Sequence, residues 1–265
     1  MVTFDKIMKN MATTRENGSL YTHIENRIAT IEFGHPASNS FPSELLERLQ
    51  KEFEQLSNDQ NVLVIVLKSE SEKAFCAGAS FDELVEIENM QQGKVFFSGF
   101  ANVINSMREC DKLIIGRIQG KAVGGGVGLA AACDYAMATD AAAIKLSELG
   151  IGIGPFVIAP AVERKMGVAA LAELSLGAHE WKNAYWAREK GLYARVFETV
   201  KELDKEIGIF AEKLASYNPE ALIEMKKILW ENTAHWKNLL PERAAISGEL
   251  ILSEFSKNAL EKFKK

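Results

Sequence analysis

Two short segments near the start of the chain alternate apolar and polar side chains. They span Leu20–Glu25 and Ile28–Phe33 and flank Asn26-Arg27, which is typical of two antiparallel strands joined by a tight turn. Phe41-Pro42-Ser43 then precedes a pattern with a period of about 3.6 residues. Its apolar positions share one face of a helix: Leu45, Leu46, Leu49, Phe53 and Leu56. A hairpin followed by an amphipathic helix is therefore expected.

Continuous apolar runs replace the alternation farther along the chain. Val62–Leu67 and Leu113–Ile118 are typical of strands buried on both faces of a parallel sheet. Shorter strands are predicted at Tyr135–Thr139 and Ile144–Leu146, and helical patterns begin near Phe81, Phe96 and Val127. From about Ala161 onward the pattern predicts helices only. The fold class is thus α/β, with strands and helices alternating first and helices filling the rest.

The boundaries that follow from this pattern describe a single domain over residues 15–265. An α/β core occupies residues 15–160 and a helical C-terminal portion occupies residues 161–265. The stretch Pro155–Pro160 between them is too apolar to be a free tether. Residues 1–14 are weakly patterned and are expected to be a loosely structured lead-in.

Composition narrows the classes of partner. The chain has 265 residues, is 47% hydrophobic and carries a formal net charge of −5, so no basic field attracts nucleic acid or an anionic membrane. Its apolar runs end well before the roughly 18 residues of a membrane-spanning helix. Three cysteines at wide spacing favour a reducing compartment. With no apolar leader at the N-terminus, the expected location is the cytoplasm.

Several kinds of chemistry lack their usual residues. The four histidines do not pair at metal-ligand spacing, either with each other or with the cysteines, so no metal site is expected. The chain has no Gly-x-Ser-x-Gly elbow and no Walker loop. Nucleophilic hydrolysis and phosphoryl transfer are therefore disfavoured.

Two glycine-rich turns are the main candidates for a site. Phe75–Ser80 follows a buried strand, and its small side chains let backbone amides approach a ligand, although an ordinary strand-to-helix turn explains it equally well. Gly124–Gly128 lies between a strand and the start of a helix, where free N–H groups favour an oxyanion. The second turn is the better candidate for anion stabilisation.

The second turn has an alternative interpretation. Gly126-x-Gly128-x-x-Ala131 matches a variant of the dinucleotide-binding fingerprint, which would indicate a nicotinamide dehydrogenase. Cys133-Asp134 already begins the next strand, however, so the full crossover helix is missing. No acidic residue lies clearly at the end of a second strand at the usual offset. The dehydrogenase remains a disfavoured alternative.

In this order and spacing, the segments resemble the crotonase (enoyl-CoA hydratase/isomerase) superfamily. The motifs that carry the resemblance are His35–Ser40, Phe75–Ala79, Gln119–Gly126, Cys133-Asp134 and Ser147–Gly150. It extends from about residue 20 to the C-terminal helices. It implies a spiral of ββα units that binds an acyl-CoA thioester and assembles as a homotrimer or a dimer of trimers. CoA enters as part of the substrate, so no separate cofactor is implied.

The same resemblance assigns roles to individual residues. The backbone amides of Ala79 and Gly125 would hold the thioester oxygen, and Glu148 would move the proton. Ser80 stands where the family usually has aspartate and Asp82 where it commonly has lysine, so the resemblance does not define the CoA phosphate contacts. The substrate-binding set implied by position is Ser38, Ser40, Ala77, Ser80, Phe81, Gly124, Gly128 and Ser147.

Gly128 departs most from the family pattern, because hydratases carry the first of two glutamates at this position. One remaining acid–base group favours isomerisation, a proton shuttle from C2 to C4, over hydration. Gly154-Pro155-Phe156 also looks like the turn of the family's Δ3-Δ2-enoyl-CoA isomerases. Two alternatives stay open: a single-glutamate hydratase, such as a 3-methylglutaconyl-CoA hydratase-like enzyme, and an acyl-CoA-binding relative without activity.

A lone glutamate is usually a solvated surface charge. Glu148, however, lies among Ile144, Leu146 and Leu149, and partial burial would raise its pKa toward neutrality, as a general base requires. Asp134 is expected to anchor a turn. Packing roles are expected for the tryptophans, either in the C-terminal helices or at a subunit interface: Trp181, Trp186, Trp230 and Trp236.

Overall fold

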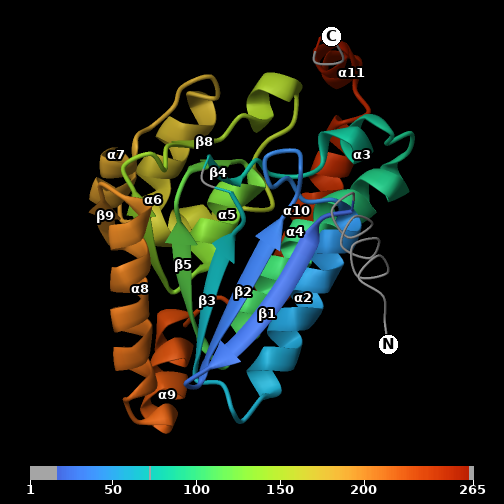
Figure 1. Ribbon diagram of the computed structural model, residues 1–265. Helices are drawn as coiled ribbons and strands as arrows, with labels where there is room; N and C mark the ends of the chain where they lie inside the picture. The colour runs from blue at the N-terminus through green and yellow to red at the C-terminus, as the bar shows by residue number, and fades with distance from the viewer. Residues whose placement is uncertain (1–16, 72, 263–265) are drawn as a thin grey trace, which may run out of the picture.

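A six-stranded sheet forms the centre of the computed structural model, which describes residues 17–71 and 73–262 (Figure 1). The expected lead-in, residues 1–14, lies outside the described residues. The strand order across the sheet is β1-β2-β3-β5-β7-β9. The strands are β1 (Ser19–Glu25), β2 (Ile28–Gly34), β3 (Val64–Ser69), β5 (Leu113–Ile118), β7 (Tyr135–Thr139) and β9 (Arg195–Phe197).

The hairpin predicted from alternation is confirmed. β1 and β2 are antiparallel, and the register pairs Glu25 with Ile28, which leaves Asn26 and Arg27 as the turn. Both turn residues have positive φ, 50° and 66°, as a two-residue hairpin turn requires. The remaining neighbours in the sheet are parallel. The α/β expectation is therefore confirmed for the body of the chain.

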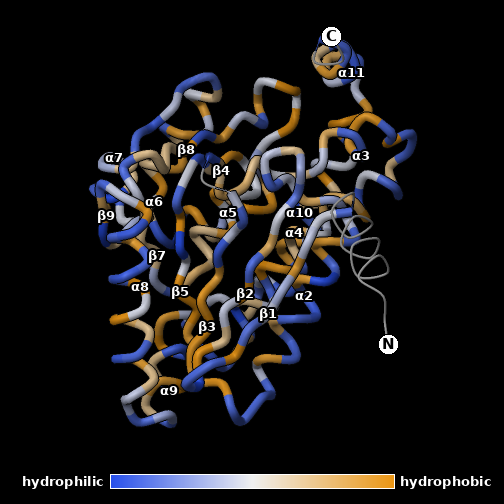
Figure 2. The backbone as a smooth tube through the Cα atoms, in the orientation of Figure 1, coloured by the Kyte–Doolittle hydropathy of each residue, from blue (hydrophilic) through white to orange (hydrophobic). Residues whose placement is uncertain are grey.

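Both faces of the sheet are covered, as the continuous apolar runs predict. Val64 and Val66 face one way and pack with Leu203 and Ile207 of helix α8 (Val200–Ala215). The intervening side chains of β3 belong to the main core on the opposite face. β3 is accordingly hydrophobic along most of its length in Figure 2.

The helices of the described ranges surround this sheet. The bounds other than those of α8 are α2 (Ser43–Asn58), α3 (Phe81–Val85), α4 (Met90–Glu109), α5 (Gly125–Ala132), η1 (Glu148–Ile151), α6 (Ala159–Leu176), α7 (Ala184–Glu189), α9 (Pro219–Leu229), α10 (Trp236–Leu250) and α11 (Glu254–Glu261). Each described helix is too short or too polar to cross a bilayer.

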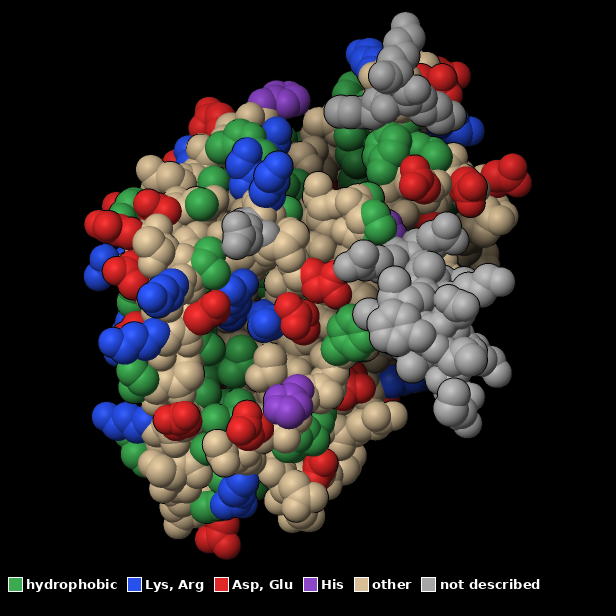
Figure 3. Space-filling model, viewed as in Figure 1, with side chains coloured by type: hydrophobic (Ala, Val, Ile, Leu, Met, Phe, Trp, Pro, Cys, Tyr) green, Lys and Arg blue, Asp and Glu red, His purple; other side chains and the backbone are tan. Residues whose placement is uncertain are grey.

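On the face seen in Figure 3, acidic and basic side chains are interspersed.

The hydrophobic pattern predicted one strand of a second, smaller sheet, at Ile144–Leu146, and missed the other two. The sheet contains β4 (Ala74–Cys76), β6 (Lys121–Val123) and β8 (Ile144–Lys145), which are parallel and in that order. β4 ends inside Phe75–Ser80, which the sequence analysis interpreted as a glycine-rich turn. A strand of three residues is too short to show the alternation of apolar and polar side chains, so it can be recognised only from its pairing with neighbouring strands.

The expectation of helices only beyond Ala161 is wrong at one segment. Arg195–Phe197 forms β9, which pairs in parallel with Met137–Thr139 of β7 and completes the edge of the large sheet. Three residues with intermediate or full exposure carry no continuous apolar signal. These residues form a strand because β7 offers free backbone groups at the edge of the sheet, and not because of a pattern in their own sequence.

Asp134 anchors the start of β7, as expected. Its Oδ2 accepts hydrogen bonds from the Ile114 amide and from Lys226 Nζ, both at 2.7 Å. Its Oδ1 accepts one from Trp230 Nε1 at 2.6 Å. The side chains of Asp134 and Lys226 are each 3% exposed, so this ion pair is shielded from water. Trp230 in turn packs edge-on against Trp236, which confirms a packing role for both.

Candidate active site

Three parallel strands of the small sheet bring the predicted site together. β4 ends at Cys76, β6 at Val123 and β8 at Lys145, and each strand is followed at once by a segment that the sequence singled out. The carboxyl ends of neighbouring parallel strands meet at one edge of a sheet, which is where ligands bind in open α/β folds. Ala77–Ala79, Gly124-Gly125 and Ser147-Glu148 therefore lie side by side.

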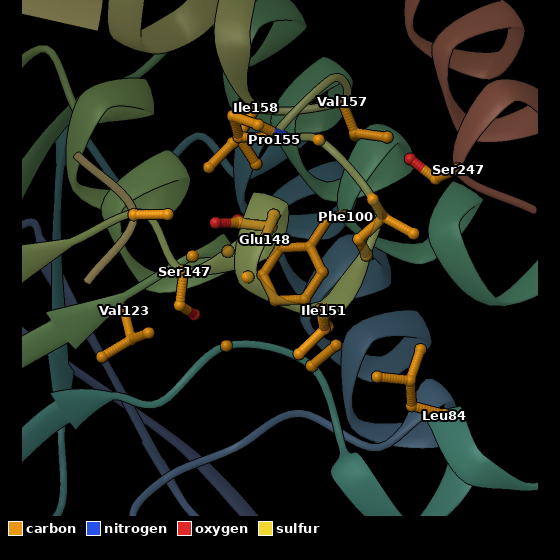
Figure 4. A pocket seen from close by; sticks show the side chains of 18 of the residues that line it. Leu84, Phe100, Val123, Ser147, Glu148, Ile151, Pro155, Val157, Ile158 and Ser247 are labelled. Atoms are coloured by element: carbon orange, nitrogen blue, oxygen red, sulfur yellow. The ribbon is translucent and has the colours of Figure 1, made fainter. Parts of the chain in front are cut away.

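These segments line a cavity of about 390 Å³. In Figure 4, Glu148 lies near its centre, with Val123 and Ser147 on one side and Leu84 and Ser247 on the other. Most of the wall is apolar. The principal apolar lining residues are Phe81, Leu84, Phe96, Phe97, Phe100, Ile151, Ile153, Pro155, Phe156, Val157 and Ile158.

The two glycine-rich turns are in direct contact at the wall of this cavity. Gly78 has φ +93°, and a Cβ on it would lie 3.1 Å from the Val123 carbonyl oxygen and 3.5 Å from the Gly125 nitrogen. A Cβ on Gly126 would lie 2.4 Å from the Cys76 carbonyl oxygen. Such an approach of one backbone to another requires glycine. The glycines thus allow two main-chain segments to converge on one point.

Two backbone amides at this point are free to donate. The Phe41 amide donates to the Gly78 carbonyl and the Ser80 amide donates to the Phe41 carbonyl, which leaves the intervening Ala79 amide without an acceptor among the described residues. Gly125 is the first residue of α5, and its amide likewise has no acceptor in that part of the chain. Free N–H groups at a helix start favour negative charge. Both can therefore hold an oxyanion.

Glu148 begins the 3₁₀ turn η1, and its carboxyl group lies against Gly124, the residue before Gly125. Its Oε2 is buried and has no hydrogen-bond partner among the described residues. Burial raises the pKa of Glu148 to about 7, an effect partly offset by the backbone amides of Glu148 and Ser147. The expected shift toward neutrality is confirmed. This carboxyl group can exchange a proton near neutral pH.

The absence of a side chain on Gly124 leaves room for the Glu148 carboxyl group. A Cβ on Gly124 would lie 2.8 Å from Glu148 Oε1, and the Gly124 backbone has φ +52° and ψ −118°. We expect Gly124→Ala to lower kcat/KM for an enoyl-CoA by about 100-fold, because the carboxyl group and the turn must both shift. Gly208→Ala on α8 is the control, since a Cβ there meets no atom within 4 Å. Unchanged kinetics in Gly124→Ala would contradict the prediction.

The structure brings together most, though not all, of the residues predicted from the sequence. Ala77, Ala79, Phe81, Gly124, Gly125, Ser147 and Glu148 line the cavity. Ser40 lies 3.2 Å from His35 Nδ1, and Ser80 caps α3 by accepting from the Glu83 amide at 3.4 Å. Ser38 lines a separate cavity, and its carbonyl accepts from the Ala77 amide at 3.2 Å. These three serines therefore shape the loops around the cavity.

Gly128 is also absent from the cavity wall, and its expected substrate contact stays a prediction. A Cβ on Gly128 would lie 2.4 Å from Ile158 Cγ2, so Ile158 fills the space in front of it. Ile158 itself lines the cavity. The position where hydratases of the resembled family carry their first glutamate is thus covered by an apolar side chain.

Other lining residues were not identified from the sequence. Trp181 is 45% exposed at the cavity, and its ring lies 5.5 Å from Lys145 Nζ. Ser247 reaches the cavity from α10, more than 90 positions beyond Glu148. Neither had a local sequence signal, because both depend on the packing of the C-terminal segments. Among the described residues, no group of three or more His, Cys, Asp or Glu is arranged to hold a metal ion.

Comparison with known proteins agrees with this geometry. The family model for enoyl-CoA hydratase/isomerase matches residues 23–263. A probable enoyl-CoA hydratase of Bacillus subtilis is 27% identical over 242 residues, which is 91% of this chain and 93% of that protein. The mitochondrial methylglutaconyl-CoA hydratase of Rattus norvegicus is 30% identical, over 71% of this chain and 59% of that protein.

A solved structure shows the same fold. The crystal structure of an enoyl-CoA hydratase from Bacillus halodurans superposes with a TM-score of 0.85 at 20% identity, covering 92% of this chain and 99% of that one. The chain therefore belongs to the enoyl-CoA hydratase/isomerase family, within the crotonase superfamily. The fold class expected from the sequence motifs is confirmed.

Proposed function

We propose that this enzyme moves a proton on an enoyl-CoA thioester through an enolate. The observation that carries the proposal is the Glu148 carboxyl group, whose Oε2 has no partner among the described residues, in one cavity with the free amides of Ala79 and Gly125. A thioester α-proton is only weakly acidic. Two fixed N–H donors stabilise the enolate oxygen as negative charge develops, which is worth about 3–4 kcal/mol per donor in comparable sites.

The preferred reaction is isomerisation of a 3-enoyl to a 2-enoyl thioester. Glu148 takes a proton from C2, and the electrons of the broken C–H bond form the enolate, whose oxygen accepts from the Ala79 and Gly125 amides. The enolate then collapses, and the protonated Glu148 returns the proton to C4. The double bond moves from C3–C4 to C2–C3, and the carboxylate is regenerated. One carboxyl group suffices for both transfers.

The composition of the cavity wall supports isomerisation over hydration. Glu148 is the only acidic residue among those that line the described cavity. Ile158 occupies the space in front of Gly128, where a second glutamate would hold a water. Since a hydratase must position water, an apolar wall at this point favours a reaction that needs none.

Hydration by Glu148 alone is the second candidate. The relatives from Bacillus subtilis and Rattus norvegicus are both named as hydratases, and one carboxyl group could activate water and then return the proton to C2.

The third candidate is acyl-CoA binding without turnover. Such a protein would hold the thioester oxygen with the same two amides but would transfer no proton. The trimer or dimer of trimers implied by the resemblance stays a prediction that sedimentation of the purified protein would test.

Matched substrates separate these candidates. Purified protein is incubated with 2-enoyl-CoA and 3-enoyl-CoA thioesters of equal chain length, and the products are separated by chromatography. Interconversion of the two without a 3-hydroxyacyl product supports the proposal. Hydration alone would establish the second candidate. Tight CoA-thioester binding without product, and without α-proton exchange in deuterated water, would establish the third.

The pH dependence follows from the pKa of Glu148. The carboxylate is the active form, so kcat/KM should rise with pH and level off above the pKa of about 7. Below that pH it should fall by about tenfold per unit, because the fraction of carboxylate falls tenfold. The measurement is kcat/KM from pH 5 to 9 at constant ionic strength. A midpoint near 4.5, the ordinary value for glutamate, would exclude Glu148 in this buried state as the base.

A further inference from the structure

One hydroxyl group stands out in the apolar half of the cavity. Helices α3, α4 and α10 contribute lining residues to this side, and among the described ones Ser247 alone has a hydrogen-bonding side chain. The others are Phe81, Leu84, Phe96, Phe97 and Phe100. A single polar group in such a wall calls for a physical reason.

Ser247 is 1% exposed, and no hydrogen bond within the described residues uses its hydroxyl group. A buried serine on a helix usually bonds to the carbonyl of the preceding turn, as Ser106 does to the Val103 carbonyl at 2.8 Å. In Figure 4 the oxygen of Ser247 points into the cavity, on the side away from Ser147. The Ser247 hydroxyl group is therefore available to hydrogen-bond a ligand that occupies the part of the cavity next to α10.

The packing of two helices fixes Ser247 in this place. A Cβ on Gly93 of α4 would lie 2.7 Å from the Gly248 Cα, so the backbones of α4 and α10 are in direct contact. Such a crossing leaves little freedom to move the neighbouring Ser247. The close helix contact requires a small residue at position 247, and either serine or alanine would meet that requirement. Packing alone therefore does not account for the hydroxyl group of Ser247, which faces the cavity without a partner.

We propose that Ser247 is a specificity-determining residue that hydrogen-bonds a neutral polar group near the far end of the acyl chain. This inference rests on the proposed function, because it takes Glu148 as the point where C2 to C4 react. A hydroxyl, ketone or amide oxygen suits the site. A carboxylate does not, since it would be buried among phenylalanine and leucine side chains without a cation contributed by these helices.

Matched pairs of thioesters test the proposal. Each pair, from four to eight acyl positions, has equal heavy-atom number, with one member ending in a methyl group and the other in a hydroxyl group. At the length where the hydroxyl meets Ser247, Ser247→Ala should lower kcat/KM for the hydroxyl-ended member about tenfold and leave the methyl-ended member within roughly twofold. Ser247→Cys should shift the ratio of kcat/KM for the two members in the same direction, because a thiol is a weak donor. Cysteine has nearly the same shape as serine, so this variant excludes loosened packing as the cause of the effect.

Ser106→Ala is the matched control, because it makes the same change at a buried helical serine outside the cavity wall. It should leave the ratio of the two members unchanged. An unchanged ratio at every length in the Ser247 variants, or an equal loss on both members, overturns the inference while the proposed function stands. If the unaltered protein turns over neither member of any pair, the proposed function fails and this inference fails with it.

Discussion

Glu148→Gln is expected to lower turnover by at least about 10³-fold and, at the same time, to make the folded protein more stable above neutral pH. The glutamine amide cannot accept the C2 proton, while the Ala79 and Gly125 backbone amides, which are proposed to hold the thioester oxygen, remain in place. Affinity for CoA thioesters should therefore persist. The gain in stability has a separate cause, which is the removal of a buried carboxylate.

The sign of the stability effect follows from the raised pKa. Burial raises the pKa of Glu148 from 4.5 to about 7 in the folded state, so the folded protein binds the proton more tightly than the unfolded chain does. Deprotonation costs stability as pH rises from about 4.5 to about 7, by up to roughly 3 kcal/mol. Glutamine does not titrate and avoids this cost. The difference between variant and unaltered protein should thus be small at pH 4.5 and largest above pH 7.

Urea unfolding at several pH values, together with turnover assays, checks both halves. Glu198→Gln is the control, because Glu198 is exposed between β9 and α8 and lies outside the cavity wall. It should change neither turnover nor the pH dependence of unfolding. An active Glu148→Gln variant would remove Glu148 from the mechanism, and equal stability at all pH values would place its carboxyl group in water.

The second large effect concerns folding alone. Asp134→Ala should destabilise the protein by about 3–5 kcal/mol, because the change leaves the Lys226 ammonium buried without its partner. It also leaves the Trp230 Nε1–H and the Ile114 amide without an acceptor. These groups tie α9 to the start of β5 and β7, so the loss should be felt across the large sheet.

Equilibrium unfolding in urea measures this loss, and activity per folded molecule should be preserved because Asp134 is outside the cavity wall. Glu224→Ala on α9 is the control. It breaks an ion pair with Lys227 in which the Lys227 and Glu224 side chains are 61% and 67% exposed, and its cost should stay below about 1 kcal/mol. A cost for Asp134→Ala as small as that of the control would contradict the prediction.

The sequence by itself determined the elements long enough to show a period. Leu113–Ile118 and Tyr135–Thr139 have the same bounds as the strands β5 and β7, and the hairpin turn falls at Asn26-Arg27. Side-chain burial repeats along a strand or helix, so several consecutive residues carry the signal. Short motifs in a fixed order were enough to identify the family. They also named Ala79, Gly125 and Glu148 as candidates, and all three line one cavity.

Only the tertiary structure decided what these residues face. β4, β6 and β9 are strands of three residues, and each exists because a partner offers free backbone groups. The raised pKa of Glu148 comes from burial in the folded protein. Ile158 fills the space in front of Gly128, the position at which hydratases carry a glutamate. Ser247 reaches the cavity through the contact of α10 with α4. Contacts between residues far apart in the chain leave no periodic trace in its sequence, because they depend on how the elements pack.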